Sequence, residues 1–124
     1  KIIGKETPTS GVTSYLVVTR GSRLEATGTA TQPIVFTSEQ DHLRGRTSPV
    51  ALNETETGEW GGIVVNGLAT INKGTDCELA ANVCEREGEG DSGLYGGDDD
   101  TDNSGTFSYM QVRYAGYALR LTMN

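Results

Sequence analysis

The sequence is poor in several features that would assign it to a common protein class. It has only three prolines and two cysteines among 124 residues, which excludes a collagen-like repeat and a disulfide-dense miniprotein. Its apolar runs are short, as at residues 16–18, so no transmembrane helix is expected. No window keeps the spacing of an amphipathic helix, and the one stretch that permits a helix is 77–84. These absences leave β-structure as the main alternative.

Short strand-like segments, rich in β-branched and aromatic residues, are abundant. They are bounded by Gly, Thr, Ser or Asn, as strands usually are. The 17 glycines fall mainly between them. The segments are 15–19, 23–26, 33–37, 62–65 and 107–114. The sequence therefore predicts an all-β chain.

Within these segments, apolar side chains alternate with polar ones and so lie on one face of each strand. The first three segments start 8 to 10 residues apart, roughly the spacing of an antiparallel sandwich or of a solenoid with three strands per turn. Residues 39–59 and 73–104 interrupt the pattern, and we expect two protruding inserts there. The predicted core is Leu16, Val18, Leu24, Ile34, Phe36, Ile63, Val65, Ile71, Met110 and Val112.

Three sequence elements resemble those of right-handed parallel β-helix proteins. They are GTATQPIVFTS at 28–38, GEWGGIVVNG at 58–67, and GLYGG at 93–97 followed by DNSG at 102–105 and YMQVRYAG at 109–116. The nearest likeness is to a poorly characterised group of exported or surface proteins, often lipoproteins, of marine bacteria. This resemblance implies a single domain over 1–124, about two coils of a longer β-helix, and an extracellular, periplasmic or cell-surface location.

Negative charge is concentrated in one part of the chain. The net charge is −7, yet residues 76–102 hold ten carboxylates and one cation, leaving the remainder with nine cations against seven anions. Nucleic-acid binding requires a basic surface that neutralises phosphates. We therefore expect no nucleic-acid partner.

The acidic stretch predicts a cation site. Asp98, Asp100 and Asp102 stand at alternate positions, and Glu89 or Asp91 could return through nearby glycines to complete the ligands. Oxygen ligands of this kind favour Ca²⁺ over Zn²⁺. The alternatives are a solvated acidic loop that serves solubility, another cation, or a basic partner.

The two cysteines, Cys77 and Cys84, have neither the spacing of a redox motif nor a second pair of metal ligands. A structural disulfide that closes a small loop in an oxidising compartment fits best. Such a bond would fix the base of the acidic insert.

Catalytic candidates are few. The only histidine, His42, lies in a polar stretch typical of the surface, and the clustered carboxylates stand among glycines rather than on strands. Trp60 could stack on a sugar ring, although a core position before two glycines is the simpler interpretation. We expect no catalytic residue here.

The resulting hypothesis is a non-catalytic exported structural or adhesive module, stabilised by Ca²⁺, that contacts polysaccharide or a cell surface. One alternative is a carbohydrate-active β-helix enzyme, a lyase or hydrolase, whose site lies mostly in further coils. Another is an assembly subunit that stacks on further coils of the same protein or on other copies.

Overall fold

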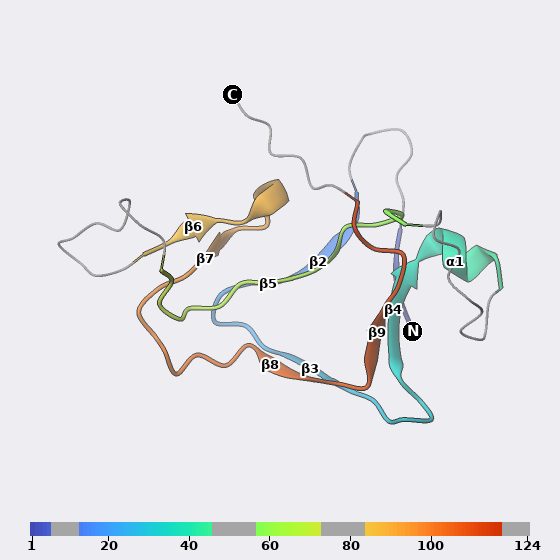
Figure 1. Cartoon of the computed structure of the whole chain (residues 1–124), viewed down its shortest axis with the longest axis horizontal. Coiled ribbons are helices and arrows are strands. Elements are labelled where there is room, and N and C mark those ends of the chain that lie inside the picture. Colours follow the sequence, from blue (N-terminus) through green and yellow to red (C-terminus); the bar gives the residue numbers. More distant parts are fainter. Residues whose placement is uncertain (6–12, 46–56, 73–83, 118–124) are drawn as a thin grey trace. The chain divides into compact units, whose positions relative to one another are not determined.

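The computed structural model describes residues 1–5, 13–45, 57–72 and 84–117, and these are mostly strands and turns (Figure 1). Its elements are β1 (Ile2–Gly4), β2 (Tyr15–Val18), β3 (Leu24–Thr27), β4 (Ile34–Ser38), α1 (Glu39–Leu43), β5 (Gly62–Val65), β6 (Arg86–Glu87), η1 (Glu89–Asp91), β7 (Leu94–Tyr95), β8 (Gly105–Ser108) and β9 (Met110–Val112). The predicted all-β character is confirmed for these described residues, which include one short α-helix.

The chain forms two compact units. Unit 1 comprises Lys1–Leu16, Ala26–Ile63 and Phe107–Leu119, and unit 2 comprises Val17–Glu25, Val64–Thr106 and Arg120–Asn124. Within the described residues, unit 1 holds β1, β4, β9 and α1, whereas unit 2 holds β6, β7 and η1.

Unit 1 is built on a parallel three-stranded sheet in the order β1-β4-β9 (Figure 1). Ile2 pairs with Phe36, and Phe36 pairs with Val112, so three apolar side chains form one column across the sheet. Phe36 at the centre is 1% exposed, whereas Ile2 and Val112 at the ends are 48% and 46% exposed. The column buries its middle member and leaves both end members half open.

The remaining pairings also join segments that are distant in sequence. β2 pairs with β5 and β3 pairs with β8, while β6 and β7 are the sequence neighbours that pair antiparallel in the described part of the chain. A sandwich built from hairpins would pair strands that follow one another directly. The observed pairing of β3 with β8, together with the parallel sheet, favours a solenoid over that sandwich.

The helix α1 was not predicted, and its signal lies in residues that the alternation pattern does not use. Ser38 ends β4 and caps the helix, because its Oγ accepts a hydrogen bond of 3.0 Å from the backbone N–H of Asp41. Serine followed three residues later by an acidic residue is a helix-start signature. The capping pair Ser38 and Asp41 therefore begins α1 within the predicted first insert.

The predicted strand at 107–114 is wrong in its continuity. The structure has β8 and β9 instead, separated at Tyr109, whose φ of 47° lies in the left-handed region. A residue in that conformation ends the extended backbone and turns the chain. The other four predicted strands agree with β2 to β5 to within one residue at each end.

The predicted core is correct at its centre and wrong at its margins. Val18 and Phe36 are buried, while Val65 and Val112 are 42% and 46% exposed. The other six predicted core residues are half-buried. Three residues outside the predicted core are buried as well: Ala26 and Tyr114, which share the apolar face of their predicted strands with predicted core residues, and Trp60.

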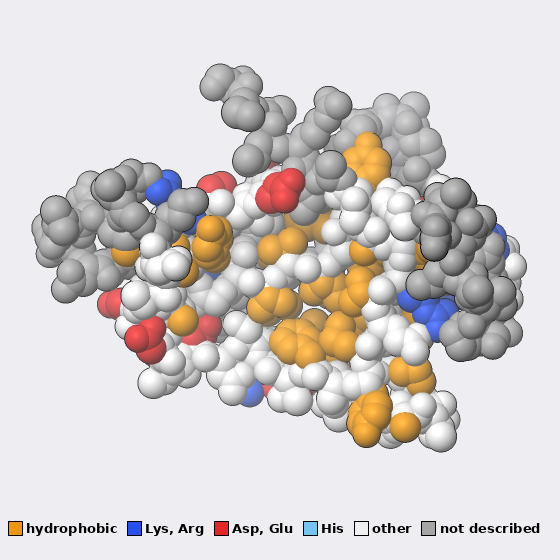
Figure 2. Space-filling view, in the orientation of Figure 1, with side chains coloured by type: hydrophobic (Ala, Val, Ile, Leu, Met, Phe, Trp, Pro, Cys, Tyr) orange, Lys and Arg blue, Asp and Glu red, His pale blue; other side chains and the backbone are white. Residues whose placement is uncertain are grey.

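Large apolar side chains reach the surface on the face shown in Figure 2. The exposed ones include Ile2, Ile3 and Phe107 in unit 1 and Leu94 in unit 2. No helix in the described ranges is long and apolar enough to cross a membrane.

Candidate functional site

The acidic segment, defined here as residues 84–102, lies in unit 2 and has a defined backbone. Its β6 and β7 form an antiparallel pair, and the N–H of Gly88 donates to the carbonyl of Gly93 at 2.9 Å. The connecting turn carries Glu89 and Asp91, both exposed, and Asp91 has a φ of 58°. This half of the segment is a small hairpin.

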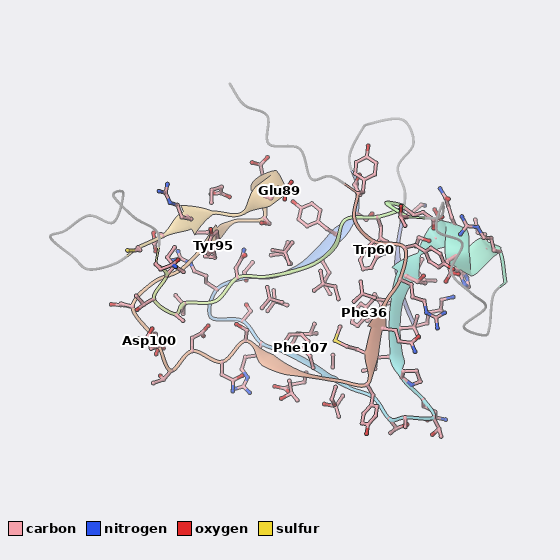
Figure 3. The ribbon with its side chains drawn as sticks, in the orientation of Figure 1. Phe36, Trp60, Glu89, Tyr95, Asp100 and Phe107 are labelled. Carbon is pink, nitrogen blue, oxygen red and sulfur yellow. The ribbon has the colours of Figure 1, made fainter. Side chains whose placement is uncertain are left out.

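Two predicted cation ligands, Asp100 (labelled in Figure 3) and Asp102, accept hydrogen bonds from backbone amides of unit 2 that lie about thirty residues earlier in the chain. Asp102 Oδ2 accepts from the N–H of Leu68, and Asp100 Oδ1 accepts from the N–H of Thr70, each at 2.9 Å. The backbone N–H of Asp99 in turn donates to the carbonyl of Leu68 at 3.2 Å. The acidic segment is therefore attached to residues 68–70 through its carboxylates and its backbone.

The contact with Thr70 has an electrostatic consequence for Asp100. Hydrogen bonds from the backbone and side chain of Thr70 stabilise the charged carboxylate and lower its pKa below the ordinary value of 3.8. A carboxylate whose pKa is lowered by folding stabilises the folded state at pH values above its pKa in the unfolded chain. That contribution is lost as the pH falls through its pKa in the folded protein. The contact is thus complete at neutral pH and weakens only in strong acid.

The predicted ligands are not gathered around one point. Asp98 is exposed and makes no hydrogen bond with the described residues, while Asp100 and Asp102 face separate amides. Among the described residues, no three acidic, histidine or cysteine side chains are grouped so that they could hold a metal ion. Calcium binding by this segment would require its exposed carboxylates to move together.

Two residues outside the acidic segment anchor it, and sequence reasoning did not select either. Arg20 pairs with the carboxylate of Glu85 and also donates to the carbonyl of Gly96 at 2.9 Å. Asn66 is 4% exposed, and its Nδ2 donates to the carbonyl of Ser92 at 2.7 Å. The sequence signal at Asn66 is the following Gly67, and an Asn-Gly pair is typical of a turn rather than of a buried anchor.

The predicted disulfide involves Cys77, which lies outside the described residues. Cys84 is half-buried and directly precedes Glu85, the partner of Arg20. The bond between Cys77 and Cys84 stays a prediction.

A second polar cluster lies in unit 1 around Asp41, which is fully buried. Its Oδ2 accepts from the hydroxyl of Thr37 at 2.7 Å and lies 3.8 Å from the Nζ of Lys1. Its Oδ1 is buried without a hydrogen-bond partner in the described residues. Next to it, Glu59 pairs with Ser38 and with Arg44. Asp41 belongs to α1, whereas Thr37 and Ser38 belong to β4. The hydrogen bonds between them therefore join α1 to the sheet of unit 1.

Trp60, the predicted sugar-stacking residue, is 2% exposed. Its indole Nε1 donates to the carbonyl of Arg113 at 2.7 Å, and a Cβ at Gly4 would lie 2.6 Å from the ring. The ring therefore offers almost no face to a ligand from solvent, and we do not include it in the proposed contact with sugar.

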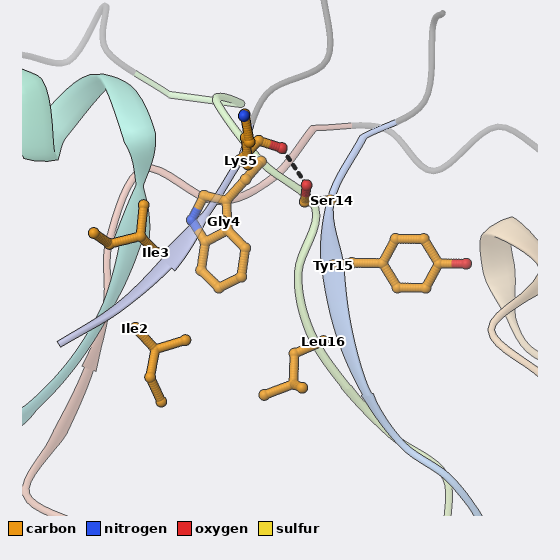
Figure 4. A pocket seen from close by; sticks show the side chains of 8 residues that line it. Ile2, Ile3, Gly4, Lys5, Ser14, Tyr15 and Leu16 are labelled. Carbon is orange, nitrogen blue, oxygen red and sulfur yellow. Dashed lines mark hydrogen bonds between the residues drawn. The ribbon is translucent and has the colours of Figure 1, made fainter.

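Beside Trp60, unit 1 has an apolar cavity of about 280 Å³ (Figure 4). Ile2 and Leu16 point into it from β1 and β2, while the ring of Tyr15 points away. Ser14 and Lys5 close one end through a hydrogen bond from Ser14 Oγ to the Lys5 carbonyl. The cavity wall is mostly apolar, and its polar members are Lys5 and Ser14.

Comparison with known proteins identifies the family. A model of the pectate-lyase-like β-helix domain matches residues 1–123, which is nearly the whole chain. Comparison with curated proteins and with solved structures gives no significant match. The match agrees with the parallel sheet and the long-range strand pairing of the described residues. The chain belongs to the pectate-lyase-like β-helix domain family.

Proposed function

We propose that this chain is a non-catalytic, exported β-helix module that contacts polysaccharide, at a cell surface or in its surroundings. In this proposal the chain forms about two right-handed coils with two loop inserts, and Ca²⁺ stabilises the acidic insert. The family supports the carbohydrate part of the proposal, because its description refers to an enzyme class that acts on a plant polysaccharide. The following paragraphs give the support for the other parts.

The observation that carries the structural role is the use of the carboxylates in the acidic segment. Asp100 accepts a hydrogen bond from the amide of Thr70, and Asp102 accepts one from the amide of Leu68. A glycoside hydrolase needs two carboxyl groups that face the same sugar from about 5 to 9.5 Å apart. Carboxylates that accept hydrogen bonds from backbone amides instead stabilise the local fold, and this use supports a structural role.

Export is the part of the proposal that rests on the predicted disulfide and on the resemblance to exported bacterial proteins, often lipoproteins. A disulfide between Cys77 and Cys84 would persist only in an oxidising compartment. By the loop-entropy estimate, closing so small a ring would stabilise the fold by about 2 to 3 kcal/mol.

The carbohydrate proposal predicts binding without cleavage. The protein should be retarded in a native gel that contains one or more soluble polysaccharides, and the polysaccharide recovered afterwards should have its original chain length. Retardation with no new reducing or unsaturated ends supports a binding module. A steady release of such ends would establish the enzyme alternative, and no retardation by any polysaccharide would remove the carbohydrate role.

The calcium proposal rests on charge density, because ten carboxylates with one cation in residues 76–102 repel one another unless a counter-ion intervenes. Calcium at 100 times its dissociation constant should stabilise the protein by about 2.7 kcal/mol through mass action. For a domain of this length, we expect the melting temperature to rise by roughly 10 °C. Differential scanning calorimetry with calcium and with chelator measures this rise.

Asp98→Asn provides the matched control for the calcium experiment. Asp98 is exposed and makes no hydrogen bond with the described residues, so its replacement should leave the melting temperature in chelator unchanged. In calcium, the same variant should lose much of the stabilisation. If wild type melts at one temperature in both buffers, the acidic insert is a solvated loop.

The stacking alternative has one specific observation in its favour. In the column of Ile2, Phe36 and Val112, only Phe36 is fully buried, because it has a neighbouring strand on each side. A strand from a further coil or from a second copy would bury Ile2 or Val112 in the same way. We therefore keep further coils or stacked copies as a second proposed partner class.

A further inference from the structure

We propose that the corner around Tyr109 is the surface of this module that binds a neutral polysaccharide. We define the Tyr109 corner as Tyr109 together with the turn 28–33, both in unit 1. This inference rests on the proposed carbohydrate role and adds to it the contact residue and the class of sugar.

Tyr109 is presented to solvent on a fixed backbone. It stands between β8 and β9, and its side chain is part of a residue that is 61% exposed, the most exposed aromatic in the described chain. Its carbonyl accepts a hydrogen bond of 2.9 Å from the N–H of Ile34, at the start of β4. The side chain itself makes no hydrogen bond or ring contact with the described residues. The backbone of Tyr109 is therefore fixed by the sheet, while most of the residue is accessible to solvent.

The backbone conformation of Tyr109 is costly, and packing does not explain it. A bulky residue at a φ of 47° is a genuine outlier. Tyr114 has a similar φ of 56°, but its ring is buried and lies beneath Arg44, 5.6 Å from the guanidinium carbon. Tyr109 has no such compensation within the described residues. Strained residues of this kind cluster at ligand-binding sites, where the strain fixes a side chain for its partner.

The neighbouring turn supplies polar groups beside the ring. Gly28 lies so close that a Cβ there would be 2.6 Å from the carbonyl oxygen of Tyr109, which places the turn 28–33 directly against the corner. The turn is ordered by hydrogen bonds from the N–H of Gln32 to the carbonyl and hydroxyl of Thr29. Gln32 and Thr31 are exposed, so the corner presents an amide and a hydroxyl to solvent as well as the side chain of Tyr109. Sugars combine an apolar ring face with hydroxyls, and this surface offers partners for both.

The charge of the corner selects the class of polysaccharide. Residues 26–38 and 107–112 contain no Asp, Glu, Lys, Arg or His, although 22% of the chain is charged. No cation is therefore present in these segments to pair with the carboxylate of a uronate. An acidic polysaccharide would lose the hydration of its carboxylates without gaining an ion pair here, whereas a neutral polysaccharide needs no such partner. The corner thus points to a polymer of uncharged sugars rather than to polygalacturonate.

Affinity electrophoresis of the full chain tests this inference with three neutral probes (a β-glucan, a galactan and a mannan) and with polygalacturonate as the acidic probe. The variants are Tyr109→Asn and Tyr117→Ala. Asparagine tolerates the left-handed backbone but has no ring, so this variant should fold at least as stably as wild type. Tyr117 is a 46% exposed tyrosine of the same unit outside the corner and is the matched control.

We expect wild type to bind at least one neutral probe more tightly than polygalacturonate. Tyr109→Asn should bind that probe about tenfold more weakly with an undiminished melting temperature, while Tyr117→Ala binds within about twofold of wild type. Equal binding by Tyr109→Asn and wild type would overturn the inference and leave the proposed function intact, as would tighter binding of polygalacturonate. If wild type binds no probe, the proposed function fails together with the inference.

Discussion

Phe36→Ala should lower the free energy of unfolding by about 3 to 5 kcal/mol, the usual cost of deleting a fully buried aromatic ring. Phe36 is 1% exposed and stands at the centre of the column that includes Ile2 and Val112. Its removal would leave a cavity between two apolar neighbours that the parallel sheet holds apart. Because a domain of this size has a total stability of about 5 to 15 kcal/mol, the melting temperature should fall steeply. Urea unfolding measures the difference.

Phe107→Ala is the matched control, since it removes the same ring from a residue of unit 1 that is 41% exposed. Figure 3 shows both phenylalanines, Phe36 on β4 and Phe107 on β8. Partial exposure reduces both the lost transfer free energy and the cavity, so we expect a cost of about 1 kcal/mol. Equal losses in the two variants would mean that Phe36 is not the centre of the core.

The success of the sequence predictions depended on how local the relevant interaction is. Alternation of apolar and polar residues placed four strands correctly, because a strand's two faces are determined by its own sequence. Alternation gives the face of Val65 and Val112 but not what covers that face, and both are exposed. It also missed the break at Tyr109, because a left-handed tyrosine has no signal in the period of apolar residues.

In the candidate site, too, the sequence did not predict contacts between residues that are distant along the chain. The sequence predicts a cation site from the alternating carboxylates of residues 98–102, and that site stays a prediction. It could not indicate that Asp100 and Asp102 face the amides of Thr70 and Leu68, because those partners lie about thirty residues earlier and belong to no repeating pattern. Arg20 lies 76 residues before Gly96 and Asn66 lies 26 residues before Ser92, and both anchors were missed for the same reason.

Gly105→Ala is expected to be the most damaging of the conservative substitutions, with a loss of about 2 to 5 kcal/mol. Gly105 begins β8 with a φ of 121°, and a Cβ there would lie 2.1 Å from the carbonyl oxygen of Leu24 and 2.7 Å from its carbonyl carbon. Both partners are backbone atoms, so the clash cannot be relieved by a side-chain rotation. Overpacking of this kind costs about 1 to 3 kcal/mol, and the left-handed φ adds about 1 kcal/mol or more.

Gly116→Ala separates the clash at Gly105 from the backbone strain. Gly116 has a φ of 99°, but a Cβ there would meet no heavy atom within 4 Å. Its replacement should therefore carry the conformational cost alone, about 1 to 2 kcal/mol. The difference between the two variants in urea unfolding isolates the contact between Gly105 and Leu24, on which the start of β8 beside β3 depends. If both variants lost the same free energy of unfolding, the backbone of Leu24 would not lie close enough to Gly105 to clash with an added Cβ.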